Sequence, residues 1–354
     1  MMLRSWAMIR LAPTTTTATN LCVRFGASSP RKPRVPLFLR PLVYTTTIPD
    51  LQKWRSWARN LALSVGSKFV ELDNGPDSHT LCREVEWLLE DAVEGYDARL
   101  RQTTATDSGG TCLRMRAGLG ELYCLWKERV EQRRPFQYVV GCEHWGDIVL
   151  SVEEGVLIPR PETVQVVELV DQLCSADQRF REGLWADLGT GSGAIAIGIG
   201  RILKGRGRVV AVDLSDVAVA VASYNVERHG LQDIVDVRHG SWFDPLEDVQ
   251  GKLDGLVSNP PYIPSDQISG LQAEVGRHEP LSALDGGQNG MDDLLCICRG
   301  SVTALRPGGF VAFETNGGEQ ADFVANFLGR NNFCNVKVVT DFAGIPRFVT
   351  GFRS

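Results

Sequence analysis

The chain has 354 residues, of which 43% are hydrophobic, and its mean hydropathy is −0.09. This composition is typical of a globular protein with room for one large domain and a smaller one. No apolar run approaches the roughly 18 residues that a membrane-spanning helix needs, so we expect neither a membrane protein nor a membrane partner.

The first 49 residues differ in composition from the rest of the chain. They contain no Asp or Glu, are rich in Thr and Ser, and carry seven of the 37 Lys and Arg residues. This composition is typical of an organelle transit peptide, with a disordered basic tail as the alternative. The remaining residues hold 30 Lys and Arg against 43 Asp and Glu, a net charge of −13. Such a surface repels a phosphate backbone, which disfavours a nucleic-acid substrate without excluding one.

The cysteines and histidines predict no metal site. Nine cysteines are scattered along the chain, and Cys296 and Cys298 are their only close pair. There is no C-x-x-C sequence, and the five histidines lie far from any ligand spacing. We therefore expect a reducing compartment without a disulfide framework. Cys296 and Cys298 fall in an apolar helical stretch and are expected in the core.

Residues 50–131 show a helical pattern. Apolar residues recur at the spacing of one helix face in three stretches: 51–69, 81–95 and 116–133. The polar stretch 103–111 between the second and third is expected to be a surface loop. The sequence therefore predicts a small helical domain, which either recognises a substrate or serves packing alone.

The spacing of the apolar residues changes between residues 132 and 158. Residues 136–141 and 147–158 alternate or run apolar with β-branched side chains, which predicts a β-hairpin that links two domains. The phrase IPRPET follows at 158–163, and then a helix is expected over 163–176.

From residue 184 onward, strands and helices alternate. The spacing predicts a doubly wound, mostly parallel α/β sheet within a domain over 159–354. The last two strands have a short connection and should form an antiparallel hairpin at its edge. The seven predicted strands lie within 184–189, 208–215, 233–240, 253–258, 309–316, 334–342 and 345–353.

The first strand-to-helix turn has the features of a cofactor site. It contains Gly189, Gly191 and Gly193, whose missing Cβ atoms let the backbone approach a ligand or adopt positive φ. Thr190 and Ser192 alternate with these glycines. A glycine pattern of this kind also occurs in dinucleotide sites.

Two acidic residues favour S-adenosylmethionine over NAD as the cofactor. Asp187 precedes the turn, and it suits a ligand with an ammonium group better than a pyrophosphate. Asp213 ends the second strand, where a carboxylate can accept both hydroxyls of a ribose. Trp242 follows the third strand and can cover an adenine ring, although simple core packing is the alternative for this side chain.

The fourth strand ends in the sequence Asn259-Pro260-Pro261-Tyr262. Because these residues follow a parallel strand, they should stand at the carboxyl edge of the sheet beside the cofactor. The Asn259 side-chain oxygen and the Pro260 carbonyl can each accept one N–H of a planar NH2 group, and Tyr262 can stack on it. Such orientation can lower a barrier by several kcal/mol, out of a ceiling of about 7–11. A stiff loop that merely ends a strand is the alternative.

Together these motifs resemble the HemK-type release-factor glutamine methyltransferases, in particular the plastid and cyanobacterial members. The resemblance covers the chain from about residue 50 to its end, although Val164 stands where the family usually has a further acid. NPPY alone is shared with methyltransferases of adenine and rRNA bases, whereas IPRPET, NPPY and EPLSALDGG together are specific. The similar phrases are RRPFQYVVG (133–141), VLIPRPET (156–163), ADLGTGSGAIAI (186–197), AVDLS (211–215), GSWF (240–243), SNPPYIP (258–264) and RHEPLSALDGG (277–287).

The resemblance implies a class I S-adenosylmethionine-dependent methyltransferase fold with a seven-stranded sheet. It implies cofactor contacts from Gly189 to Gly193 and at Asp213, Trp242 and Asn259, and substrate contacts in the NPPY sequence. It further implies that Arg160, Pro161 and Glu162 support the rim of the site and that Glu279 and Pro280 brace the NPPY loop. The helical domain would grip the release factor.

We therefore expect N5-methylation of the Gly-Gly-Gln glutamine of an organellar release factor, with base methylation of rRNA or DNA as the alternative. The similarity to plastid members favours the chloroplast stroma over the mitochondrial matrix. The chain also contains its own Gly286-Gly287-Gln288. We interpret this tripeptide as a coincidence rather than as a target of self-methylation.

Overall fold

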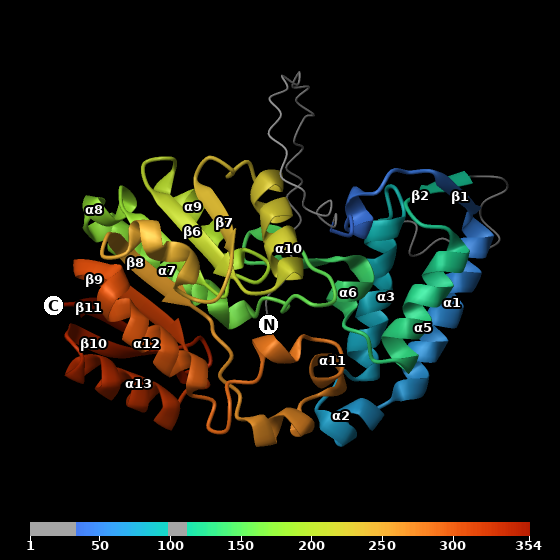
Figure 1. The fold of residues 1–354 in the computed structure, drawn as a ribbon. Coiled ribbons are helices and arrows are strands. Elements are labelled where there is room, and N and C mark those ends of the chain that lie inside the picture. The colour runs from blue at the N-terminus through green and yellow to red at the C-terminus, as the bar shows by residue number, and fades with distance from the viewer. Residues whose placement is uncertain (1–32, 98–111) are drawn as a thin grey trace. The chain divides into compact units, whose positions relative to one another are not determined.

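A computed structural model describes residues 33–97 and 112–354 of the chain (Figure 1). These residues all belong to one unit, Lys32–Ser354. The loop that we predicted at 103–111 lies outside the described residues. Within the described ranges, no helix combines the length and the apolar character needed to cross a membrane.

Three helices lie side by side in the first part of this unit, α1 (Ile48–Val65), α3 (Ser78–Ala92) and α5 (Leu119–Glu131) (Figure 1). Each buries one face, and the buried faces form a shared apolar core, as the helical period predicted. The first predicted helix is divided, because Gly66 at φ 58° ends α1 and the short α2 (Lys68–Asp73) follows.

Residues 33–49, which we assigned to the targeting segment, are part of the fold. A 3-10 turn, η1 (Leu37–Leu39), buries Leu37 completely. Strand β1 (Tyr44–Thr47) pairs antiparallel with β2 (Cys112–Met115), and the Thr47 side chain accepts a hydrogen bond from the N–H of Asp50 to cap α1. The fold thus begins before residue 49, whereas cleavage of the chain stays a prediction.

The predicted hairpin is shorter than expected. Strands β3 (Cys142–Trp145) and β4 (Ile148–Ser151) pair antiparallel, but the strand that we expected over 136–141 is wrong. These residues form the helix α6 (Phe136–Val140). Pro135 precedes it with φ −50°, and Gly141 ends it in the left-handed conformation. Its apolar side chains join the core of the helical region, which overrides their β propensity.

A seven-stranded sheet in the order β10-β11-β9-β8-β5-β6-β7 forms the second part (Figure 1). Neighbouring strands are parallel except at β11, which is antiparallel to both β9 and β10. This arrangement confirms the mostly parallel sheet with a terminal antiparallel hairpin. The strands are β5 (Leu184–Leu188), β6 (Arg208–Asp213), β7 (Val235–His239), β8 (Leu253–Ser258), β9 (Leu305–Glu314), β10 (Phe333–Thr340) and β11 (Pro346–Arg353).

Helices cover both faces of this sheet, so two apolar cores result. Trp185 and Ala186 are successive in β5 and point into different cores, as the alternation of a strand requires. Cys298 is buried as expected, but Cys296 is exposed and that prediction is wrong. The first core includes residues of α7 (Val164–Ala176), α8 (Gln178–Arg181), α9 (Ala194–Leu203) and α10 (Asp216–Arg228), and the second includes residues of α12 (Asp292–Ala304) and α13 (Glu319–Arg330).

The strand order places a crevice at the carboxyl edge of the sheet. From β5, the chain adds β6 and β7 on one side and later β8 and β9 on the other. Ligands bind α/β sheets where the order reverses in this way. The long connection from β8 to α12 lies at this edge and contains four short elements: η4 (Ser265–Gly270), α11 (Ala273–Gly276), η5 (Leu281–Ala283) and an isolated bridge between Ile263 and Asp285. Two further 3-10 turns are η2 (Pro161–Thr163) and η3 (Asp244–Val249).

Candidate active site

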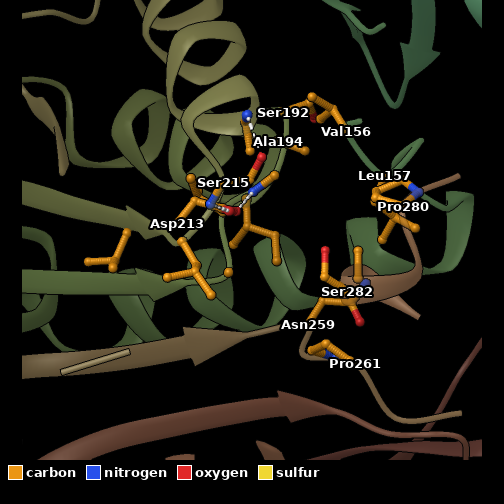
Figure 2. Close-up of a pocket in the computed structure, with 18 of the residues that line it drawn as sticks. Val156, Leu157, Ser192, Ala194, Asp213, Ser215, Asn259, Pro261, Pro280 and Ser282 are labelled. Atoms are coloured by element: carbon orange, nitrogen blue, oxygen red, sulfur yellow. Dashed lines mark hydrogen bonds between the residues drawn. The ribbon is translucent and has the colours of Figure 1, made fainter. Parts of the chain in front are cut away.

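A cavity of about 400 Å³ opens at the carboxyl edge of the sheet (Figure 2). Its walls come from the turns after β5, β6, β7 and β8 and from the segments 155–163 and 280–283. The volume lies in the range of small-molecule sites. Of the predicted site residues, Gly189, Thr190, Gly191, Ser192, Asp213, Trp242, Asn259, Pro261 and Pro280 line this cavity.

The glycine turn after β5 forms one wall of the cavity. Gly189 has φ 72°, and a Cβ on it would lie 3.5 Å from the Trp242 ring, so a side chain there would meet both backbone strain and the opposite wall. Gly193, which we expected to contact a cofactor, does not line the cavity. It caps α9 in the left-handed conformation at φ 84°.

Asp213 stands on the cavity wall at the end of β6. Its Oδ2 accepts a hydrogen bond from the N–H of Gly191 at 2.8 Å, and its Oδ1 accepts one from the N–H of Ser215 at 2.9 Å. Burial raises the pKa of this carboxyl, while the backbone N–H groups oppose the shift. These bonds fix the carboxylate and leave further lone pairs that can accept from a diol.

Asp187 lies beneath the glycine turn rather than on the cavity wall. It is fully buried, and its Oδ2 accepts from the Thr190 hydroxyl at 2.6 Å and from the Ala196 N–H at 3.1 Å. Burial raises the pKa of Asp187 to about 7. Asp187 does not line the cavity, and its buried Oδ1 has no hydrogen-bond partner among the described residues, so the contact with an ammonium group stays a prediction. Its carboxylate ties the turn to the start of α9.

Trp242 faces the cavity across the glycine turn. Its backbone has φ 40°, which is unusual for a residue with a large side chain. Part of the side chain packs against the core of the second sheet face, so the packing role and the cavity role coexist. Asp293 of α12 also lines the cavity, and burial raises its pKa while a hydrogen bond with Trp242 opposes the shift.

Asn259 lies at the junction of two cavities. Figure 2 shows it with Pro261 and Ser282 across the large cavity from Asp213. A smaller cavity of about 50 Å³ is lined by Asn259, Pro260 and Tyr262. The side chain that was predicted to orient a planar NH2 group therefore stands between the predicted cofactor space and the other residues of the NPPY sequence.

Two residues that the sequence analysis missed hold this loop. The Asn259 Nδ2 group donates to Thr163 Oγ1 at 3.2 Å, and the Thr163 hydroxyl donates to Glu314 Oε2 at 2.7 Å. The Tyr262 hydroxyl donates to Glu314 Oε1 at 3.2 Å. Glu314 is 1% exposed, and burial raises its pKa to about 7. An acid at the end of an otherwise apolar strand next to NPPY was the signal that could have revealed it.

The backbone of the NPPY loop is held by the DGG sequence that follows it. The N–H of Ile263 donates to the carbonyl of Leu284 at 3.0 Å, and the N–H of Gly286 donates back to the carbonyl of Ile263 at 2.9 Å. A Cβ on Gly286 would lie 2.7 Å from the Pro261 carbonyl oxygen, so only glycine fits there. This contact gives the Gly286-Gly287 pair a structural role of its own.

Arg160 and Glu279 form a partly buried ion pair beside the cavities. The two guanidinium nitrogens of Arg160 approach the Glu279 carboxylate at 2.8 and 2.9 Å, and the N–H of Ile158 donates to the same carboxylate at 3.3 Å. Trp145 Nε1 donates to the Arg160 carbonyl at 2.7 Å. The supporting role of Arg160 at the rim stays a prediction. The side-chain contacts of Glu279 are with the 158–160 segment rather than with NPPY. Pro161 starts the 3-10 turn η2, which contains Glu162 and ends at Thr163.

Comparison with known proteins shows which families this chain resembles. A family model, "Methyltransferase small domain", matches residues 169–273. The release factor glutamine methyltransferase of Gloeobacter violaceus is 42% identical over 270 residues, which are 76% of this chain and 90% of the relative. That of Synechocystis sp. is 36% identical over 303 residues, which are 85% and 95% of the two chains. Among solved structures, the hMettl16 catalytic domain in complex with MAT2A 3'UTR hairpin 6 aligns at 16% identity with a TM-score of 0.46, over 66% of this chain and 80% of that one.

The family model and the sheet order confirm the predicted fold class, a class I S-adenosylmethionine-dependent methyltransferase. The two bacterial relatives are more than 30% identical to this chain along at least nine tenths of their own length. The chain belongs to the family of release factor glutamine methyltransferases.

Proposed function

We propose that this chain transfers a methyl group from S-adenosylmethionine to the side-chain amide nitrogen of the glutamine in the Gly-Gly-Gln motif of a peptide-chain release factor. The observation that carries the proposal is the orientation of Asn259. Its Nδ2 group is engaged by Thr163, which leaves Oδ1 to accept from an NH2 group at the junction of the two cavities. The names of the bacterial relatives supply the substrate class.

The residues of the large cavity fit S-adenosylmethionine. The Asp213 carboxylate suits the ribose hydroxyls, Trp242 suits the adenine ring, and the glycine turn leaves backbone exposed without Cβ atoms. When bound, this cofactor supplies an electrophilic methyl group. The chain supplies the position and the orientation of the nitrogen that accepts it.

Asn259 and Pro260 do the orienting. An amide nitrogen is a poor nucleophile, because its lone pair is delocalised over the neighbouring carbonyl. If Oδ1 of Asn259 and the carbonyl of Pro260 each accept one N–H, the nitrogen is held in place and a pyramidal geometry is favoured. Positioning of this kind can contribute several kcal/mol, against a ceiling of about 7–11. No base is needed beforehand, because the proton leaves after the new bond has formed.

The same acceptors select against a carboxylate. A glutamate in place of the glutamine would bring no N–H donors and would face two acceptor oxygens. A buried group left unpaired costs about 1–3 kcal/mol, and sites built to bind an N–H can discriminate by about 10⁴. The site should therefore methylate glutamine and leave glutamate unmodified.

Labelling of a purified release factor tests this function. The full chain is incubated with methyl-labelled S-adenosylmethionine and a bacterial-type release factor, and the labelled residue is located by mass spectrometry. We expect label on the Gly-Gly-Gln glutamine and none on a matched release factor in which that glutamine is changed to glutamate. A parallel reaction with rRNA and DNA decides the base-methylating alternative. Label on nucleic acid but not on the release factor would refute the proposal.

We also propose that the protein acts in an organelle, with the chloroplast stroma preferred to the mitochondrial matrix. The acid-free, hydroxyl-rich composition of residues 1–49 supports an organellar address, and the similarity to proteins of Gloeobacter and Synechocystis supports the plastid. A fluorescent fusion of residues 1–60 should enter chloroplasts. Fluorescence confined to mitochondria would favour the alternative, and fluorescence in the cytosol would contradict both.

A further inference from the structure

Glu314 connects three parts of the chain that are distant in sequence. Its carboxylate accepts from Thr163 of η2 at 2.7 Å and from Tyr262 of the NPPY loop at 3.2 Å, and Thr163 in turn accepts from Asn259 at 3.2 Å. Glu314 ends β9, which is paired in parallel with β8 directly before NPPY. The acid therefore lies behind the loop and does not line either cavity.

The direction of these hydrogen bonds determines the orientation of Asn259. The Thr163 hydroxyl has a single proton and can donate only one hydrogen bond. An ionised Glu314 accepts that hydrogen bond, because a carboxylate can only accept. Thr163 must then accept from its other neighbour, so Asn259 has to present its NH2 group to Thr163. The carboxamide oxygen is thereby turned toward the side where a planar NH2 group would be bound.

We propose that Glu314 is a positioning residue that acts through Thr163 to hold the Asn259 oxygen toward the acceptor amide. This inference rests on the proposed amide methylation and adds to it the residues that orient the acceptor. It assigns a role to the threonine of the IPRPET phrase. The same carboxylate accepts from Tyr262, so one acid orders the two polar side chains of the NPPY sequence.

Protonation of Glu314 would reverse the chain of hydrogen bonds. A carboxylic acid can donate to Thr163 Oγ1, and the Thr163 hydroxyl can then donate to Asn259. The carboxamide would turn its oxygen toward Thr163 and its NH2 group toward the substrate, which offers donors of its own. Two donors would face each other, so the acceptor amide would no longer be held.

The surroundings of Glu314 set the pH at which this reversal occurs. Burial raises its pKa to about 7, hydrogen bonds from Thr163 and Tyr262 oppose the rise, the charge of Arg347 on β11 opposes it too, and the charge of Glu162 adds to it. Arg347 is itself paired with Asp341 at 3.0 Å. Because the ionised form is the productive one, turnover should fall as the pH falls through this value. About one tenth of the ionised form remains one pH unit below the pKa.

A matched pair of variants at Thr163 tests the relay. Thr163→Ser keeps the hydroxyl, whereas Thr163→Val removes it at nearly the same volume. We expect kcat of the wild type and of Thr163→Ser to fall about tenfold between pH 8 and pH 6. Thr163→Val should lose about tenfold or more of kcat at pH 8. Its kcat should no longer show the acid limb, which is the fall between pH 8 and pH 6. The affinity for S-adenosylmethionine, measured by calorimetry, should stay within about threefold. Glu314→Gln should likewise lose the acid limb, and thermal denaturation checks that each variant folds.

A second readout does not depend on turnover. The side-chain ¹⁵N resonance of Asn259, assigned by its loss in Asn259→Ala, should titrate near pH 7 in the wild type and in Thr163→Ser but not in Thr163→Val. The relay would be overturned if the Asn259 chemical shift did not change with pH in the wild type. It would also be overturned if Thr163→Val kept full kcat and an intact acid limb. If the wild type titrates in this way but labels no release factor, the proposed function fails and the relay stands.

Discussion

Asn259 lines both cavities, and its side-chain nitrogen and oxygen have different tasks. Nδ2 donates a hydrogen bond to Thr163 at 3.2 Å, and Oδ1 is the atom that we propose as the acceptor for the substrate. The cavity that we propose for the cofactor has many other lining residues, including the glycine turn and Asp213. The two functions of the site, cofactor binding and acceptor positioning, should therefore separate when this single side chain is removed.

Asn259→Ala should lower kcat on a release factor by about 100-fold or more, because one positioned hydrogen bond at a reacting group is typically worth that much. Calorimetry should find the affinity for S-adenosylmethionine within about tenfold of the wild type. Asn289→Ala, at an exposed residue of the same long connection, is the control and should change neither quantity. An equal loss of affinity and turnover in Asn259→Ala would indicate that Asn259 serves cofactor binding alone.

Asp187 differs from Asn259 because it stabilises the glycine turn without lining the cavity. Its folded-state pKa of about 7 is raised above the usual value of 3.8. Between these two values the folded protein binds more protons than the unfolded one, so the contribution of this carboxyl to stability falls as the pH rises from about 4 to 7. At neutral pH and above, an uncharged acceptor of the same shape should serve at least as well.

We therefore expect Asp187→Asn to be at least as stable as the wild type at pH 8 in urea denaturation. The amide oxygen can take the place of Oδ2, which accepts from both Thr190 and Ala196. Asp187→Ala leaves both donors unpaired and should lose about 1–3 kcal/mol. Calorimetry should place the cofactor affinity of Asp187→Asn within about threefold of the wild type. A loss of tenfold or more would instead mean that Asp187 contacts the cofactor's ammonium group directly.

At the scale of elements, the long connection between β8 and α12 is attached to the helical region by a buried ion cluster. Glu274 of α11 accepts from Arg129 at 2.9 Å and from Arg133 at 2.7 Å. Arg129 also pairs with Glu84 of α3 at 2.7 Å, and the N–H of Ala273 donates to Asp73 of α2 at 3.0 Å. The connection that begins with the NPPY loop is thus bonded directly to α2 and α5 and, through Arg129, indirectly to α3.

Glu274→Ala should lower the free energy of unfolding by about 3–5 kcal/mol, because it leaves buried guanidinium charge without its partner. Burial alone would raise the pKa of Glu274, but the bonds from Arg133 and the charge of Arg129 lower it, so the carboxylate stays ionised at neutral pH. Chemical denaturation measures the change. Asp147→Ala breaks the exposed ion pair with Arg201 and is the control, with an expected change of at most about 1 kcal/mol. Equal effects of the two variants would refute the role of the cluster.

The elements that the sequence predicted share one property, which is a local pattern. The sheet strands are blocks of five to ten residues, most of which alternate with helices along the chain, so their type and order could be read directly. The pairing of β1 with β2 could not, because each strand has only four residues and the two lie far apart in sequence. Glu274 was missed for the same reason, and although the position of Glu314 at a strand end was visible in the sequence, its contact with Thr163 was not. Their partners Arg129 and Thr163 lie 145 and 151 residues away, and no local pattern marks such a contact.

At the scale of the whole molecule, the first 49 residues combine a predicted targeting role with a structural role, because the fold begins within them. The composition of this segment is uniform, so it gave no sign that its last third is built into the fold. The structure places Leu37 in the core of the helical region and pairs Arg40 with Glu121 of α5 at 2.7 Å. A processing site that keeps these contacts has to lie before them.

Two truncations distinguish these roles. A chain that lacks residues 1–49 loses the buried Leu37 and Ile48, strand β1 and the Thr47 cap of α1, whereas a chain that lacks residues 1–32 keeps them all. Removal of a buried leucine side chain costs about 2–5 kcal/mol and loss of a cap costs about 1 kcal/mol. The shorter chain should therefore be less stable than the longer one by at least about 3 kcal/mol in chemical denaturation. Leu37→Ala in the full chain is the matched control and should account for a large part of this difference. Equal stability of the two truncated chains would mean that the fold does not need residues 33–49, and the boundary at residue 49 would then hold for both processing and folding.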